Sequence, residues 1–161
     1  MELLISALFA ALIITAMISD GRRFLIPNWI SIALLVLFVA RVLVGSFSLP
    51  IAMHVLVATL VFAVAYGSFL ANWFGGGDVK LLTVVSLWAG PAHITQLLLI
   101  MSVSGMVLGL GILAARHLIA RAPVRERAWL GPLPGWAARG KCPYGIAIGV
   151  GALAVLLVPA T

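Results

Sequence analysis

Long stretches of apolar residues dominate the chain and alternate with short polar segments. Six such stretches cover residues 3–19, 29–44, 50–74, 79–90, 94–115 and 144–158. A membrane-spanning helix needs about 20 predominantly apolar residues, whereas a membrane barrel would show alternating polar and apolar positions in strands of about ten residues. The continuous pattern therefore predicts an all-α, polytopic membrane helix bundle of about six spans. We expect a single domain over residues 1–161.

The fourth stretch is short, and the basic residues decide whether it crosses the membrane. If residues 79–90 span, the segments 20–28, 75–80 and 116–143 share one face. That face then holds nine of the ten Lys and Arg residues: Arg22, Arg23, Lys80, Arg116, Arg121, Arg125, Arg127, Arg139 and Lys141. If the fourth stretch is re-entrant instead, the basic residues are divided between two faces. Because cytoplasmic loops are rich in Lys and Arg, we predict six spans, with the N-terminus and the C-terminus outside the cytoplasm.

One long polar segment interrupts the apolar pattern, over residues 116–143. We interpret it as a basic cytoplasmic loop that sets the orientation of the chain. Contact with membrane lipids through anionic headgroups, or docking of a partner protein, would be alternative roles. The tenth basic residue, Arg41, lies late in the second stretch, where its aliphatic stem lets the charge extend to the interface.

Composition excludes several other classes of protein. Of the 161 residues, 64 % are hydrophobic and 9 % are charged, whereas a soluble domain has about 25 % charged residues. The net charge of +6 is explained by membrane orientation, so we predict no nucleic-acid partner. The single cysteine, Cys142, excludes a disulfide scaffold and a zinc module with paired CxxC motifs. His54, His93 and His117 lack the spacing of metal ligands, and we predict neither a metal nor another cofactor.

Two of the four acidic residues are placed to carry chemistry. Glu2 lies at the N-terminus and Glu126 in the basic loop, whereas Asp20 and Asp78 each lie at the predicted cytoplasmic end of a span. Two carboxylates within hydrogen-bonding range share one proton, so that one can activate water while the other protonates a carbonyl group. This arrangement is typical of aspartic proteases.

Each aspartate also has a simpler explanation as half of an ion pair. Asp20 would pair with Arg22 or Arg23, and Asp78 would pair with Lys80. An ionisable residue at a membrane boundary is costly when it is buried without a partner. The sequence alone leaves the ion-pair explanation open for either aspartate.

The ends of the predicted helices suggest different roles for the two carboxylates. Asp20 ends the first span, where the helix dipole disfavours a negative charge, whereas Asp78 begins the fourth, where free N–H groups stabilise one. We therefore expect Asp78 to act as the base and Asp20 as the proton carrier. Glycines precede Asp78, and the missing Cβ atoms at Gly75 and Gly77 would let another backbone approach.

Small residues and turn residues give further expectations about packing. Pro27 and Asn28 indicate the start of the second helix, with Asn28 as a capping residue. Two GxxxG patterns, at positions 105–109 and 145–149, are candidate sites of close helix contact. We expect Ser102 and Ser104 to be packing residues, because no base lies near them in the sequence.

Two segments carry a resemblance to a known family. Residues 20–28 read Asp-Gly-Arg-Arg-Phe-Leu-Ile-Pro-Asn, and residues 75–80 read Gly-Gly-Gly-Asp-Val-Lys. They resemble the D-x-R-x-x-x-I-P-N stretch and the GxGD motif of the type IV prepilin peptidases, in the right order and each at a predicted cytoplasmic helix end. Residues 141–145, at the start of the last span, are similar to that family's proline-aromatic-glycine segment. The chain resembles the small peptidase-only branch associated with Tad/Flp-type pili.

The resemblance implies an aspartic endopeptidase embedded in the inner membrane of a bacterium or archaeon. It would remove the short basic leader of a prepilin or pseudopilin substrate at the cytoplasmic face. Asp20 and Asp78 would be the catalytic pair, and Gly75, Gly77 and Lys80 would shape the second motif. Larger members also methylate the new N-terminus and carry a domain with paired CxxC motifs. Because this chain starts directly at its first span and has one cysteine, we expect no methyltransferase activity.

Two other functions remain compatible with these residues. A GxGD protease of the presenilin or signal-peptide-peptidase type would cut within a membrane helix, but it carries its first aspartate inside a span after tyrosine, whereas Asp20 follows Ser19. A non-enzymatic transport protein or pilus-assembly scaffold would use Asp20 and Asp78 to bind a proton or a cation. The sequence identifies neither the substrate-binding residues nor the oligomeric state.

Overall fold

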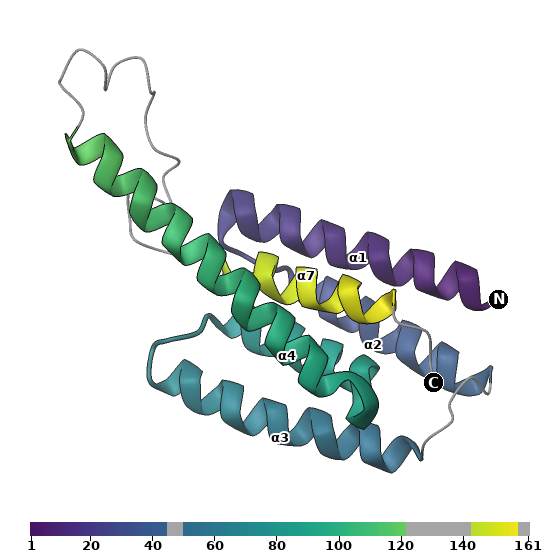
Figure 1. Cartoon of the computed structure of the whole chain (residues 1–161). Helices are drawn as coiled ribbons and strands as arrows, with labels where there is room; N and C mark the ends of the chain where they lie inside the picture. The colour runs from purple at the N-terminus through teal and green to yellow at the C-terminus, as the bar shows by residue number, and fades with distance from the viewer. Residues whose placement is uncertain (45–49, 122–142, 158–161) are drawn as a thin grey trace.

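The computed structural model describes residues 1–44, 50–121 and 143–157, and it contains helices but no strand in these segments (Figure 1). The helices are α1 (Glu2–Arg23), α2 (Asn28–Leu43), α3 (Ile51–Leu70), α4 (Gly76–Arg121) and α7 (Tyr144–Leu156). α1, α3 and most of α4 are long and apolar enough to cross a membrane, and α2 and α7 are shorter apolar helices. The predicted all-α membrane bundle is therefore confirmed.

Parts of the predicted basic loop and of the predicted last span lie outside the described residues. Residues 116–121 of the predicted basic loop 116–143 belong instead to α4, whereas residues 122–142, with Cys142, and the C-terminal segment 158–161 lie outside the described residues. The number of spans, the side of the membrane on which the termini lie, and the extent of the single domain stay predictions.

The long helix α4 consists of two arms that meet at Gly90. Gly90 has φ 58° and ψ −170°, a backbone conformation that is essentially restricted to glycine. Gly90 is followed by Pro91, which has no N–H to donate to the carbonyl group of Leu87 four residues earlier. The predicted fourth and fifth apolar stretches, residues 79–90 and 94–115, therefore belong to two separate arms.

A buried histidine satisfies the carbonyl group that Pro91 leaves without a helical donor. His54 of α3 is 6 % exposed, and its Nδ1–H donates to the carbonyl oxygen of Leu87 at 2.9 Å. A Cβ atom added to Gly90 would overlap the His54 ring. His54 therefore packs the reversal of the chain against α3, and this contact explains a histidine within an apolar span.

The contacts between helices set the direction of each element. The last turns of α1 contact the first turns of α7, since Gly145 meets Asp20 and Gly149 meets Met17. Gly105, on the second arm of α4, also meets Tyr144. The end of α1, the start of α7 and the middle of the second arm therefore lie at one end of the bundle.

Of the two GxxxG patterns, only one forms a helix contact along its whole length. Gly145 and Gly149 both face α1, where an added Cβ would collide with side chains. Gly105 faces α7, but an added Cβ at Gly109 would meet nothing within 4 Å. Gly109 therefore faces open space in the described structure.

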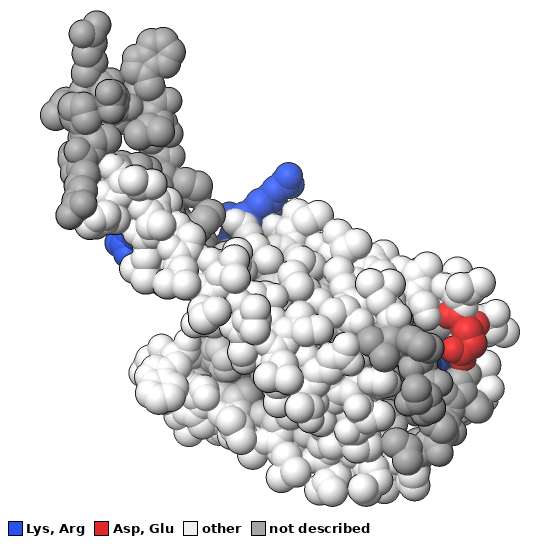
Figure 2. All heavy atoms as spheres, viewed as in Figure 1, with Lys and Arg blue, Asp and Glu red and all other residues white. Residues whose placement is uncertain are grey.

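The bundle buries large apolar side chains at its centre and exposes many others at its outer surface. The most deeply buried apolar side chains come from α1, α2, α4 and α7 and include Ile13, Ile30, Leu34, Leu81, Leu97 and Ile148. The face in Figure 2 shows almost no charge between the bundle's ends, with acidic atoms at one end and basic atoms toward the other. In lipid an apolar exterior carries no hydrophobic cost, so this surface fits a membrane protein.

Aromatic packing joins α1, α2 and α4 at the end where α1 begins. Trp88 lies 4.5 Å from Phe9 and 5.9 Å from Phe38, measured between ring centroids, and its indole N–H donates to the carbonyl oxygen of Leu34 at 3.1 Å. The guanidinium group of Arg41 lies 5.5 Å from the Trp88 ring centroid and 3.9 Å from the Glu2 carboxylate. These contacts hold Arg41, the one basic residue that was not predicted to lie on the basic face.

Candidate active site

The two sequence motifs pack directly against each other. A Cβ atom added to Gly77 would lie 3.2 Å from the Cβ atom of Ile26, so a larger residue would force the two segments apart. Three residues later, the Lys80 ammonium group donates to the side-chain oxygen of Asn28 at 3.0 Å. The segment around Ile26 therefore lies against the first turn of α4, as the missing Cβ at Gly77 allows.

Asn28 begins α2 but does not cap it with its side chain, which differs from our expectation. Pro27 is the N-cap residue, and no side chain caps the helix there. The Asn28 amide oxygen instead accepts the bond from Lys80. The hydrogen bond between Lys80 and Asn28 therefore joins the two motifs.

Asp78 lies in the first turn of α4 and is partly buried. Its carboxylate Oδ2 accepts the backbone N–H of Gly75 at 3.3 Å, as the acidic residue of a capping box does. A Cβ atom added to Gly75 would lie 3.0 Å from the same oxygen. The missing Cβ at Gly75 therefore makes room for the Asp78 carboxylate to fold back over the helix start, and the expected approach of another backbone at Gly75 stays a prediction.

Asp20 is buried near the end of α1, with 5 % of its surface exposed. Its carboxylate Oδ2 accepts the backbone N–H of Gly145 at 2.8 Å. The first N–H groups of a helix have no partner within that helix, so Asp20 caps the N-terminus of α7 from another helix. A Cβ atom at Gly145 would lie 2.7 Å from the same carboxylate oxygen, and only glycine fits this contact without movement.

The helix ends do not distinguish the charges of the two aspartates in the way we expected. Asp20 ends α1, but its carboxylate lies at the N-terminus of α7, where the helix dipole stabilises negative charge. Asp78 lies at the N-terminus of α4. The clear remaining difference is exposure, because Asp20 is buried and Asp78 is only partly so.

The ion-pair explanation for the aspartates is wrong. Within the segments that the structure describes, neither Asp20 nor Asp78 forms a salt bridge with Arg22, Arg23 or Lys80. Arg22 and Arg23 are exposed in the last turn of α1. The two carboxylates are instead held by the backbone N–H groups of Gly145 and Gly75. None of these three basic side chains neutralises either carboxylate, so both can take part in proton transfer.

The structure brings the two aspartates to the same end of the bundle. The contacts of Gly77 with Ile26 and of Lys80 with Asn28 hold the segment that follows Asp20 against the helix start that carries Asp78, and the two carboxylates interact electrostatically. Two such groups do not ionise independently. Together they can hold one proton between them and exchange it with a bound water molecule or a carbonyl group.

Sequence reasoning missed the role of Gly145. Gly145 was expected only as part of a family-like segment and of a GxxxG pattern that packs helices together, and no contact with an aspartate was predicted for it. Gly145 lies 125 positions from Asp20 in the chain. The available signal was a glycine two residues after Pro143, at a helix start where N–H groups lack partners.

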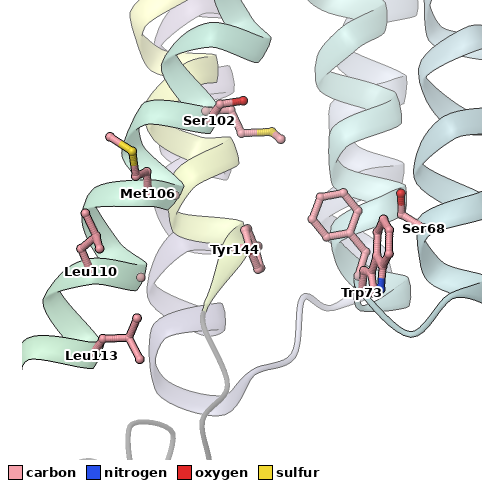
Figure 3. Close-up of a pocket in the computed structure, with 11 residues that line it drawn as sticks. Ser68, Trp73, Ser102, Met106, Leu110, Leu113 and Tyr144 are labelled. Atoms are coloured by element: carbon pink, nitrogen blue, oxygen red, sulfur yellow. The ribbon is translucent and has the colours of Figure 1, made fainter. Parts of the chain in front are cut away.

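An apolar groove of about 630 Å³ opens beside this site, between the end of α3, the second arm of α4 and the start of α7 (Figure 3). Its lining consists of Ser68, Trp73, Phe74, Met101, Ser102, Gly105, Met106, Gly109, Leu110, Leu113 and Tyr144. The Phe74 and Tyr144 rings meet edge to face, with their centroids 5.3 Å apart. Ser102, which we expected to be a packing residue, is exposed in this groove.

Comparison with known protein families identifies a match over most of the chain. Residues 7–110 match the type IV leader peptidase family. The matched segment contains both aspartates and both motifs that we compared with prepilin peptidases. No curated protein and no solved structure shows significant similarity to the chain.

Proposed function

Because the chain belongs to the type IV leader peptidase family, we propose that it is an aspartic endopeptidase in which Asp20 and Asp78 hydrolyse one peptide bond of a prepilin-like substrate. The observation that carries this proposal is the packing of the two motifs against each other at one end of the bundle, where the N–H group of a glycine holds each carboxylate. Holding both groups in place before the substrate binds favours catalysis, because less of the barrier is spent on orientation.

The two carboxylates divide the proton transfers between them. One carboxylate takes a proton from water as the water oxygen bonds to the scissile carbonyl carbon, and the other, which is protonated, gives its proton to the carbonyl oxygen. When the tetrahedral intermediate collapses, the carbon–nitrogen bond breaks and the leaving nitrogen receives the proton that the first carboxylate took from water. A hydroxyl group of the intermediate returns its proton to the second carboxylate, so both carboxyl groups regain their starting protonation states.

The location of the site supports a substrate cut at the membrane surface. Asp20 precedes Arg22 and Arg23 in the last turn of α1, and the basic segments of the chain favour a cytoplasmic position for this end. A prepilin with a charged leader in the cytoplasm and an apolar helix in the bilayer would present its scissile bond at this level. We place the protein in the inner membrane of a bacterium or archaeon and take Flp-type prepilins of Tad systems as its substrates.

Cleavage of a co-expressed prepilin tests the proposal. The wild type should shorten the prepilin, as seen by its mobility on a gel, whereas Asp20→Asn and Asp78→Asn should each leave it intact while remaining in the membrane. Glu2→Gln is the matched control, because Glu2 is acidic and lies at the opposite end of α1, so this variant should cleave normally. Cleavage that survives Asp20→Asn or Asp78→Asn would contradict a two-aspartate mechanism and favour the scaffold alternative.

A further inference from the structure

The groove lined by α3, α4 and α7 ends at residues that adjoin both carboxylates. Phe74 precedes Gly75, whose N–H group binds Asp78. Tyr144 precedes Gly145, whose N–H group binds Asp20. The Phe74 and Tyr144 rings contact each other and both line the groove. A chain lying in the groove would therefore reach the two aspartates by passing this aromatic pair.

The walls of the groove suit an apolar helix. They belong to α3 and the second arm of α4, which are both long apolar helices, and their large side chains Met106 and Leu110 are exposed. On the same arm, Ser102, Gly105 and Gly109 have small side chains or none. Small residues of this kind allow the close approach of a second helix in a membrane.

The sparse polar groups of the groove support the same occupant. The Ser68 hydroxyl donates to the carbonyl oxygen of Val64 in its own helix at 3.0 Å, so it is already satisfied. An apolar helix also satisfies its own backbone groups and needs few polar partners.

We propose that this groove binds the apolar helical segment of the substrate that adjoins the scissile bond, and that Phe74 and Tyr144 contact the substrate beside that bond. The inference rests on the proposed function and deepens it by naming where the substrate lies. Because each ring is one residue from a glycine that holds a carboxylate, the occupant also contacts the two segments that position Asp20 and Asp78.

Two glycines on the same arm of α4 provide a matched test. An added Cβ meets nothing within 4 Å at Gly109 or at Gly111, so both positions accept a side chain. Gly109 lines the groove and Gly111 does not, since two residues along a helix turn the side chain by about 200°. We would compare Gly109→Phe with Gly111→Phe in the full chain, in membranes, against a prepilin that the wild type cleaves.

Gly109→Phe should lower kcat/KM for the prepilin by about tenfold or more, mainly through KM, and Gly111→Phe should leave it within about twofold of the wild type. Equal cleavage by the two variants, or an equal loss in both, would overturn the proposal. Wild-type cleavage is measured first, so a failure of the proposed function is seen separately from a failure of the groove.

A photocrosslinking side chain gives a second readout that does not depend on turnover. It is placed at Met106, which lines the groove and is exposed, or at Gly111 as the control, in an Asp78→Asn background that holds the uncut prepilin. A crosslink to the apolar segment of the prepilin from position 106 but not from 111 supports the proposal. Crosslinks from position 106 only to lipid, or only to a second copy of the chain, overturn it.

Discussion

Gly145 and Asp20 are joined by a hydrogen bond of 2.8 Å between the backbone N–H of one and the carboxylate of the other. The bond connects the start of α7 to the end of α1, and an added Cβ at Gly145 would meet the Asp20 Oδ2, Cγ and Cβ atoms at 2.7, 2.9 and 3.0 Å. Gly145 therefore determines where the carboxylate of Asp20 lies, although it supplies no reacting group.

Replacing Gly145 by alanine should displace Asp20 and lower the rate of cleavage. A misplacement of about 1 Å can cost on the order of a hundredfold in rate, so we expect kcat to fall by about that factor with little change in KM. Initial rates of prepilin cleavage over a range of substrate concentrations measure both constants. Gly67→Ala is the control, because an added Cβ meets nothing within 4 Å there. A Gly145→Ala enzyme with normal kcat would show that Asp20 does not need this position.

The bond between Lys80 and Asn28 should contribute modestly to stability. Lys80 and Asn28 are both exposed, and a hydrogen bond to a charged group is worth about 1.5–3 kcal/mol when shielded and less in water. We therefore expect Lys80→Met and Asn28→Ala each to cost about 1 kcal/mol or less. Prepilin cleavage should persist in both variants, because neither residue touches a carboxylate in the structure.

A double-mutant cycle isolates this pair. The loss of stability in the double variant should be smaller than the sum of the two single losses, because the second change removes a bond already broken. Thermal unfolding in detergent measures all four proteins. Strict additivity would mean that the Lys80 contact contributes nothing to the junction of the two motifs.

His54→Leu should destabilise the bundle without removing activity at low temperature. The substitution leaves the carbonyl oxygen of Leu87 without its donor, and an unsatisfied buried acceptor costs about 1–3 kcal/mol. His54→Gln, which keeps a donor, should recover part of the loss. The midpoint of thermal unfolding in detergent is the measurement, with exposed His117 changed to Leu as the control. An unchanged midpoint in His54→Leu would contradict the role of His54 at the chain reversal.

Gly90→Ala should be at least as damaging as His54→Leu. The new residue would be forced into a conformation that costs about 1–3 kcal/mol for residues other than glycine, and its Cβ would overlap the His54 ring. Combining Gly90→Ala with His54→Ala should relieve the overlap but retain the backbone strain. The unfolding midpoints of Gly90→Ala, His54→Ala and the double variant separate the cost of the overlap from the cost of the backbone strain. If Gly90→Ala alone were as stable as the wild type, neither the overlap nor the strain would be real.

Much of the architecture could be predicted because it depends on local patterns. Continuous apolar runs specify membrane helices through their length, and most helices begin and end close to the predicted stretches, although α4 continues to Arg121, beyond the predicted end at residue 115. The separation of the fourth and fifth stretches was also expected, because the distribution of basic residues favoured two spans there. Charge distribution placed Asp20 and Asp78 at one end of the bundle, where the structure has them.

The partners of the key side chains could not be predicted from the same patterns. The expected ion pairs joined residues that are close in sequence, but Asp20 binds Gly145 at a separation of 125 positions, and His54 binds Leu87 at a separation of 33. Such bonds depend on which helix faces pack together. The asymmetry inferred for Asp20 from its own helix failed because a second helix supplies the N-terminus that it caps.

The sequence by itself therefore determined the class of fold, the two motifs and the candidate aspartates, because hydropathy and charge act through the bilayer on each segment separately. Only the tertiary structure decided that Gly145 holds Asp20, that Asn28 takes Lys80, and that a groove beside Phe74 and Tyr144 leads to the carboxylates. The physical reason is that a backbone N–H group is present at almost every residue and acquires a specific role only when packing brings one acceptor to it.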